Sequence, residues 1–136
     1  MKGEIKMKKI ILTLICFAVV LGAGYYIGSG FTKVGTIYIT DFTMSGDGTE
    51  ITIKTGNFSS AGFIRKARVH QQECGKLYID FISAFGGING DFGAKDEFVI
   101  PLEPETKSIG VFRASGSYEV VLEKNENSEW NYKRAE

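Results

Sequence analysis

The chain has 136 residues and equal numbers of basic and acidic side chains, 16 of each, so it carries no net charge. The charge is unevenly distributed, because the 105 residues after position 31 hold twelve basic against fifteen acidic side chains. A mildly acidic domain lacks the clustered basic surface that nucleic-acid binding requires, so we expect no nucleic-acid partner. Its length suits one domain with a core of its own.

The first structural element is an uncharged apolar run from Ile10 to Ile27. As a helix it would be roughly 27 Å long, close to the hydrocarbon thickness of a bilayer, about 30 Å. Tyr25 and Tyr26 stand at its far end, where aromatic rings favour the lipid–water interface. Residues 1–9 contain four lysines and one glutamate. The positive-inside rule therefore predicts a single-pass signal anchor with a cytoplasmic N-terminus and an exported C-terminal domain.

A cleaved signal peptide, and hence a secreted domain, is the alternative. Its apolar core is shorter, about 7–15 residues, and it needs small residues at the cleavage site. Leu21 is bulky at the best candidate site, so we favour a retained anchor. Cys16 is read as a small apolar residue within the span. Cys74 is the only cysteine after the span, which excludes a disulfide within the domain.

Residues 28–35 are rich in glycine and predict a short flexible linker. Alternating apolar residues then predict seven strands over residues 36–124, followed by a polar tail over 125–136. This pattern favours an all-β, antiparallel, immunoglobulin-like sandwich, with a small β-barrel as the alternative. Pro101 cannot donate a ladder hydrogen bond and predicts an edge strand. The strands are expected near 36–43, 50–55, 63–70, 76–84, 98–102, 107–113 and 118–122.

Alternation also predicts which side chains face the core. On the third strand Lys66, Arg68 and His70 are expected to share the outer face. The inward side chains are expected to be Ile51, Ile53, Phe63, Ala67, Val69, Leu77, Ile79, Phe81, Phe98, Ile100, Leu102, Ile109, Val111, Tyr118, Val120 and Leu122.

The stretch YIDFISAFGGINGDFGAKDEFVIPL, followed by VFRASGSYEVVLEKN, resembles a group of small membrane-anchored proteins of Gram-positive bacteria. The resemblance covers roughly Lys66 to the C-terminus. It implies a compact β domain at the cell membrane. It supplies no activity and no site residues.

Catalytic and metal-binding patterns are weak. His70 is the only histidine and Cys74 stands four residues after it, but we read the pair as an exposed strand histidine beside a turn cysteine. The acidic pairs Asp96–Glu97 and Glu103–Glu105 are read as solvated strand ends. We therefore expect no catalytic residues, no cofactor and no metal site.

Two surfaces are candidates for binding. The glycine-rich loop over residues 85–93 carries Phe85, Ile88 and Phe92, which could grip a partner. We favour the alternative, in which these side chains plug one end of the sandwich. The face with Lys66, Arg68 and His70, to which Lys54 could add, is a candidate for binding an anionic wall polymer or lipid head group, with an ordinary solvated sheet face as the default reading.

The sequence as a whole indicates a membrane-anchored, non-catalytic binding or assembly module at the cell envelope. Its partners would be the membrane and an envelope protein or wall polymer. The alternatives are a module that binds wall carbohydrate through Tyr38, Tyr78 and Phe112, and a small envelope enzyme. A flat aromatic face would favour the first alternative, and polar side chains in a cleft would favour the second.

Overall fold

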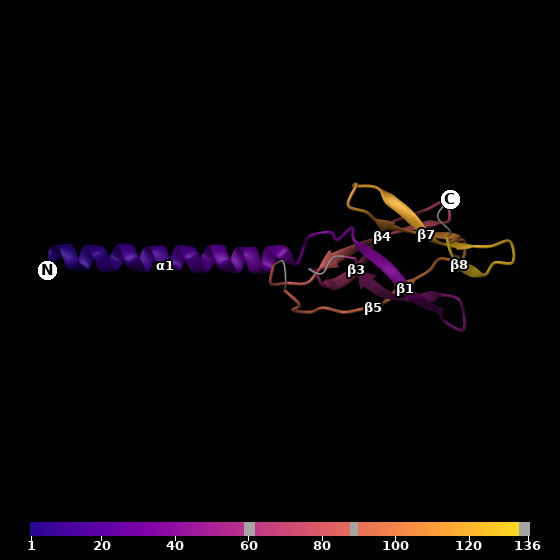
Figure 1. The fold of residues 1–136 in the computed structure, drawn as a ribbon, viewed down its shortest axis with the longest axis horizontal. Coiled ribbons are helices and arrows are strands. Elements are labelled where there is room, and N and C mark those ends of the chain that lie inside the picture. The colour runs from indigo at the N-terminus through magenta and orange to yellow at the C-terminus, as the bar shows by residue number, and fades with distance from the viewer. Residues whose placement is uncertain (59–61, 88–89, 134–136) are drawn as a thin grey trace.

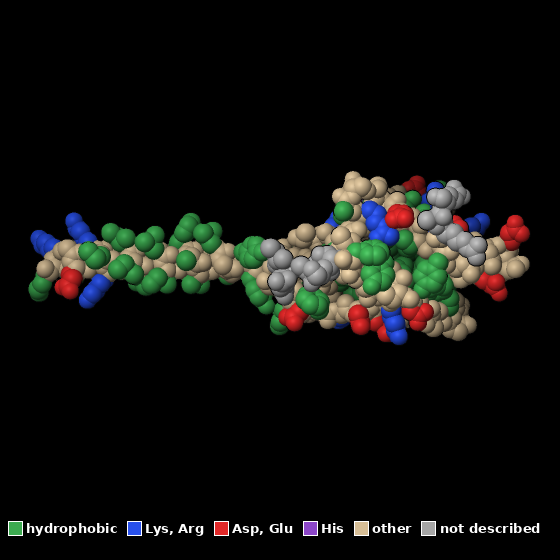
Figure 2. Space-filling view, viewed as in Figure 1, with side chains coloured by type: hydrophobic (Ala, Val, Ile, Leu, Met, Phe, Trp, Pro, Cys, Tyr) green, Lys and Arg blue, Asp and Glu red, His purple; other side chains and the backbone are tan. Residues whose placement is uncertain are grey.

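A long helix and a two-sheet β domain make up the protein. The computed structural model describes residues 1–58, 62–87 and 90–133. Helix α1 (Lys2–Ser29) projects from one end of the domain, and none of its residues is buried (Figure 1). Basic side chains gather at the free end of α1, and apolar side chains cover its middle (Figure 2). The helix is long and apolar enough to cross a membrane, as the run from Ile10 to Ile27 predicts.

The β domain is a two-layer, sandwich-like structure, and over the described residues its sheets do not close into a barrel. One sheet has three strands in the order β1-β2-β5, and the other has five in the order β3-β4-β6-β7-β8. The strands are β1 (Ile37–Met44), β2 (Glu50–Asn57), β3 (Ile64–Glu73), β4 (Lys76–Ser83), β5 (Glu97–Pro101), β6 (Ser108–Phe112), β7 (Tyr118–Lys124) and β8 (Trp130–Tyr132).

The core lies between the two sheets, and most of the predicted inward residues form it. Phe81 of β4 contacts Phe98 of β5 across the sheets, with ring centroids 5.8 Å apart. Strand β5 is an edge strand, as Pro101 predicts. The buried apolar cluster consists of Ile37, Ile51, Ile53, Ile64, Leu77, Ile79, Phe81, Phe98, Ile100, Leu102, Ile109, Val111 and Leu122.

The structure has eight described strands where the sequence predicts seven, and one pair is parallel. The extra strand, β8, lies in the segment expected to be a polar tail, where Trp130 packs against the core. The parallel pair is β4 with β6. It arises because β5 between them belongs to the other sheet, so the chain returns to the five-stranded sheet in the same direction.

Bulges overturn three of the predicted inward positions, and a fourth, Val69, is 37% exposed on edge strand β3. A register shift beside Gly110 turns Tyr118 and Val120 to the outer face, while Leu122 stays in the core. A second shift, between Ile64 and Lys66, leaves Ile64 buried and Phe63 exposed. A bulge adds one residue to a strand, so alternation read straight along the sequence fails beyond it.

The predicted linker is paired with the domain. Lys33 forms a bridge with Ile82 of β4, and the Val34 amide donates to the Phe81 carbonyl at 2.8 Å. This segment extends the sheet where β6 stops pairing with β4 at Ile79. The domain is therefore joined to α1 by hydrogen-bonded chain, in contrast to the flexible spacer that glycine content predicts.

Candidate functional site

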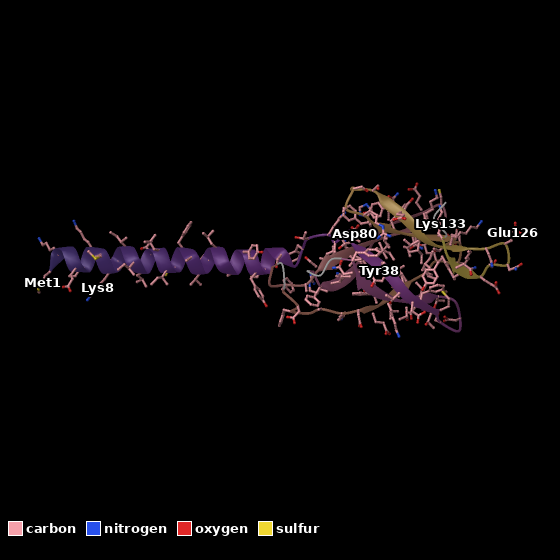
Figure 3. All side chains as sticks on the ribbon, viewed as in Figure 1. Met1, Lys8, Tyr38, Asp80, Glu126 and Lys133 are labelled. Carbon is pink, nitrogen blue, oxygen red and sulfur yellow. The ribbon has the colours of Figure 1, made fainter. Side chains whose placement is uncertain are left out.

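A buried carboxylate, Asp80, organises the outer face of the five-stranded sheet. It is 0% exposed, in the middle of β4. Its Oδ2 atom lies 3.2 Å from Lys33 Nζ, 3.1 Å from Arg68 Nη2 and 3.3 Å from His70 Nδ1. Its Oδ1 atom accepts a hydrogen bond from the Tyr118 hydroxyl at 2.6 Å. We call these five residues the Asp80 cluster; Figure 3 labels Asp80 itself.

Four segments bring these side chains together. Arg68 pairs directly with Asp80 across the β3–β4 ladder. His70 sits in the register shift between Val69 and Gln71. Lys33 comes from the segment paired with β4 on its other side, and Tyr118 reaches the outer face because of the β7 bulge. The sheet irregularities thus supply the geometry of the site.

The surroundings of Asp80 keep it ionised. Burial alone would raise the pKa of its carboxyl group. The hydrogen bonds from Tyr118, Arg68 and Lys33, together with the charge of Lys33, outweigh burial and hold the pKa of Asp80 below its ordinary value. Burial and the Asp80 carboxylate in turn raise the pKa of Tyr118 to about 12. The tyrosine is therefore a neutral donor at any physiological pH.

Aromatic rings border the charged groups. The Tyr118 ring lies 5.0 Å from the His70 ring, 5.0 Å from Tyr78 and 5.8 Å from Phe112, measured between centroids. Lys33 Nζ lies 5.0 Å from the Phe112 centroid. A Cβ on Gly110 would come within 2.8 Å of the Tyr78 ring, so only glycine lets that ring lie over β6.

Of the basic face predicted from the sequence, the structure brings Arg68 and His70 together at Asp80. Lys66 and Lys54 lie outside the Asp80 cluster. Lys66 is exposed on the same face, opposite Ile82. Lys54 lies on β2 in the other sheet, where it pairs with Glu97. Tyr78 and Phe112 share the cluster face, whereas Tyr38 lies on β1 against Phe58.

Sequence reasoning missed Asp80, Lys33 and Tyr118. The signal for Asp80 was present, since an acidic residue in the middle of the strongly apolar strand KLYIDFISA must be exposed or paired. No local pattern marks Lys33 or Tyr118, because their positions depend on non-local pairing and on a bulge.

The cluster does not resemble a hydrolytic site. His70 lies beside Asp80, as a base lies beside its orienting acid, but its other contact is the Tyr118 ring and not Cys74. Among the described residues no serine, threonine or cysteine is hydrogen-bonded to His70, and no group of three or more His, Cys, Asp or Glu side chains could hold a metal ion.

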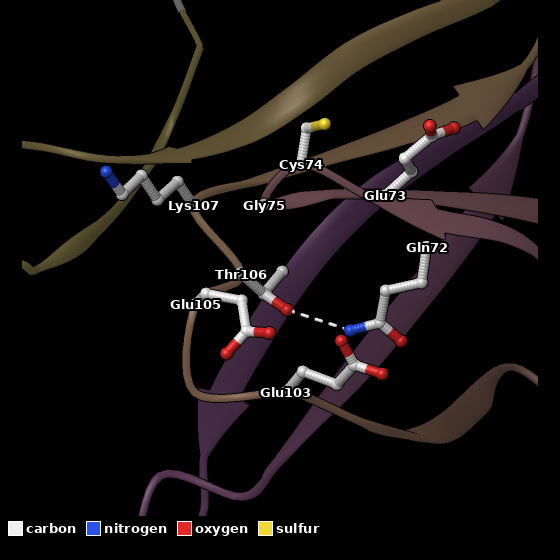
Figure 4. A pocket seen from close by; sticks show the side chains of 8 residues that line it. All are labelled: Gln72, Glu73, Cys74, Gly75, Glu103, Glu105, Thr106 and Lys107. Atoms are coloured by element: carbon white, nitrogen blue, oxygen red, sulfur yellow. Dashed lines mark hydrogen bonds between the residues drawn. The ribbon is translucent and has the colours of Figure 1, made fainter.

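A hollow of about 420 Å³ lies beside the β3–β4 turn (Figure 4). Glu103 and Glu105 line it, and the Gln72 amide donates to the Thr106 hydroxyl at 2.9 Å. The Cys74 thiol points away from these carboxylates (Figure 4). The acidic pair Glu103–Glu105 thus borders a hollow that is open to solvent, and the Cys74 thiol does not face either carboxylate.

The glycine-rich loop lies at the end of the domain nearest α1. Phe85 is half-buried, and its ring centroid lies 6.0 Å from Phe31 and 6.3 Å from Phe92. Phe92 is 65% exposed and so does not plug the sandwich. Ile88, the third apolar residue of the loop, lies outside the described residues.

Comparison with protein-family models, curated proteins and solved structures found no match for the chain. Any function assigned to it must therefore come from the geometry of its own residues.

Proposed function

We propose that the chain is a single-pass membrane protein whose β domain lies outside the cytoplasm and binds an anionic polymer of the cell envelope without catalysis. The orientation rests on the lysines of residues 1–9, which precede the apolar part of α1. We also propose that the scaffold is of the immunoglobulin-like type, which the packing of two sheets around one core supports.

The observation that carries the proposal is the charge of the Asp80 cluster. Lys33 and Arg68 together outweigh the single carboxylate by one positive charge. The carboxylate is buried beneath three basic side chains, which are 35%, 52% and 41% exposed for Lys33, Arg68 and His70. A ligand approaching from solvent therefore meets the donors first.

Asp80 also fixes the positions of these donors. Long basic side chains lose conformational freedom when they bind a ligand, and this loss weakens binding. Because Lys33 and Arg68 are already held by Asp80, much of that cost is met in the free protein. Phosphate and carboxylate groups are the natural partners of a guanidinium and an ammonium held in this way.

The aromatic border favours a polymer with a sugar or polyol backbone over a small inorganic ion. The rings of Tyr78, Phe112 and Tyr118 lie on the same open sheet face. Such a face can accept a chain lying along it. Retention of α1 would keep this face near the membrane, where even weak binding matters because the local concentration is high.

Binding of poly(glycerol phosphate) to the full chain in lipid nanodiscs tests the proposal. We expect Arg68→Gln to weaken binding about tenfold, which corresponds to about 1.4 kcal/mol. Lys54→Gln removes one exposed positive charge from the other sheet and is the matched control. The proposal predicts that neutral dextran binds more weakly than the phosphate polymer. Equal affinities of the two variants for poly(glycerol phosphate) would contradict it.

A further inference from the structure

We propose that the α1-facing end of the β domain is itself a lipid-contacting surface, with the exposed rings of Phe31 and Phe92 lying in the interfacial layer of the bilayer. This inference shares with the proposed function only the premise that α1 spans the membrane. It concerns a different surface, which is mainly apolar, whereas the Asp80 cluster is charged.

The first observation is that the glycine-rich loop holds the end of α1. The Gly86 and Gly87 amides donate to the Ser29 hydroxyl at 3.1 and 2.9 Å, and the Gly86 amide also lies 3.3 Å from the Tyr26 carbonyl. Gly87 has a φ of +86°, and a Cβ there would lie 2.7 Å from the Tyr25 ring. Glycine is therefore needed both for the backbone turn and for the close approach to α1.

The second observation is the apolar character of this end. Phe31, Phe85 and Phe92 form what we call the aromatic collar, in which Phe31 is 67% and Phe92 is 65% exposed. Arg65 crosses the collar, its guanidinium carbon 4.4 Å from the Phe85 centroid and 5.6 Å from that of Phe31. Large exposed rings beside a cation suit the boundary between acyl chains and phosphates.

The third observation is the position of the collar along the membrane normal, measured from the apolar span. No charged residue occurs between Lys9 and Lys33. A hydrocarbon core of about 30 Å is filled by about 20 helical residues. Counted from Ile10, that length ends at Ser29, the last residue of α1. The collar begins two residues later, so it lies at the headgroup level. The surface is thus continuous with the span, which identifies its partner as lipid.

A recess between α1 and the domain agrees with this placement. It has a volume of about 680 Å³ and is lined by Tyr25, Gly28, Ser29 and Gly87 together with residues 32–36. Ser29 and Gly87 also form the contact between α1 and the glycine-rich loop, so the recess borders that contact.

Tryptophan fluorescence in phosphatidylcholine vesicles tests the inference. The full chain is reconstituted, and flotation with the vesicles is checked first. Phe92→Trp and Phe31→Trp report on the collar, while Val99→Trp places an indole at a similarly exposed apolar position, 58% exposed, on edge strand β5. The native Trp130, on β8 at the far side of the domain from α1, supplies a common background (Figure 1).

We expect the Phe92→Trp and Phe31→Trp emission to shift to shorter wavelength in vesicles and to be quenched by lipids brominated near the head group. Emission from Val99→Trp and from Trp130 should stay unquenched. The inference is overturned if the protein fails to float, if neither collar tryptophan is quenched, or if the Val99→Trp signal is quenched equally. Failure to float would remove the premise that both proposals share. The quenching readings do not depend on polymer binding by Arg68, so they test this inference alone.

Discussion

Removal of one hydroxyl group, in Tyr118→Phe, measures how strongly the Asp80 cluster is held together. The hydroxyl donates to the buried carboxylate at 2.6 Å, whereas the ring would keep its contacts with His70 and Tyr78. A hydrogen bond to a charged group contributes about 1.5–3 kcal/mol. Because Asp80 keeps Lys33 and Arg68 as partners in the variant, we expect a loss of about 2 kcal/mol.

Tyr78→Phe is the matched control, since the same atom is removed from a neighbouring ring on the same face. Among the described residues the Tyr78 hydroxyl has no hydrogen-bond partner, so this change should cost no more than about 0.5 kcal/mol. Thermal unfolding of the full chain in detergent micelles, followed by Trp130 fluorescence, provides the assay. A loss of 1 kcal/mol lowers the midpoint of a domain of this size by about 4–8 °C. Equal midpoints for the two variants would refute the view that the Tyr118–Asp80 bond stabilises the cluster.

The pKa of Asp80 is lowered, so its contribution to stability is complete above the unfolded value of about 3.9 and is lost as the pH falls through the folded value. The unfolding midpoint should therefore fall more steeply below about pH 4 in the wild type than in Asp80→Asn, and identical slopes would argue against it. Phe81→Ala should cost about 3–5 kcal/mol in chemical denaturation and Lys54→Ala no more than about 0.5 kcal/mol, whereas similar losses would show that the assigned sheet faces are wrong. Cys74 is exposed in the β3–β4 turn and should react with a membrane-impermeant maleimide on intact cells, while Cys16 within the span should not. Reaction of Cys74 only after permeabilisation would reverse the predicted orientation.

The elements that the sequence predicted well are those with a local cause. Ile51, Ile53, Leu77, Ile79 and Phe81 alternate without interruption, and all five are fully buried. The apolar run in α1 was recognisable from length and composition alone. These patterns depend only on the periods of a strand and of a helix.

The errors have non-local causes. Tyr118 faces outward because of a bulge in β7, and no residue type announces a bulge. The parallel pairing of β4 with β6 depends on β5 crossing to the other sheet. Strand β8 forms within a mostly polar segment because the large Trp130 ring packs against the core.

The candidate site was predicted only in part for the same reason. Arg68 and His70 are two residues apart on one strand, so the sequence alone predicts that they lie on the same face. Lys33 is far from them in sequence and reaches Asp80 only because its segment pairs with β4. The site therefore becomes visible only when sheet pairing is known.

The central claim is that the face around Asp80 binds an anionic polymer. Amide NMR spectra of the isotope-labelled full chain in detergent micelles, recorded during titration with poly(glycerol phosphate), test it most directly. We expect the changes in chemical shift to concentrate at Lys33, Arg68, His70, Phe112 and Tyr118, and to weaken as salt is added. Shifts concentrated on β1, β2 and β5, or spectra that do not change with the polymer, would contradict the claim.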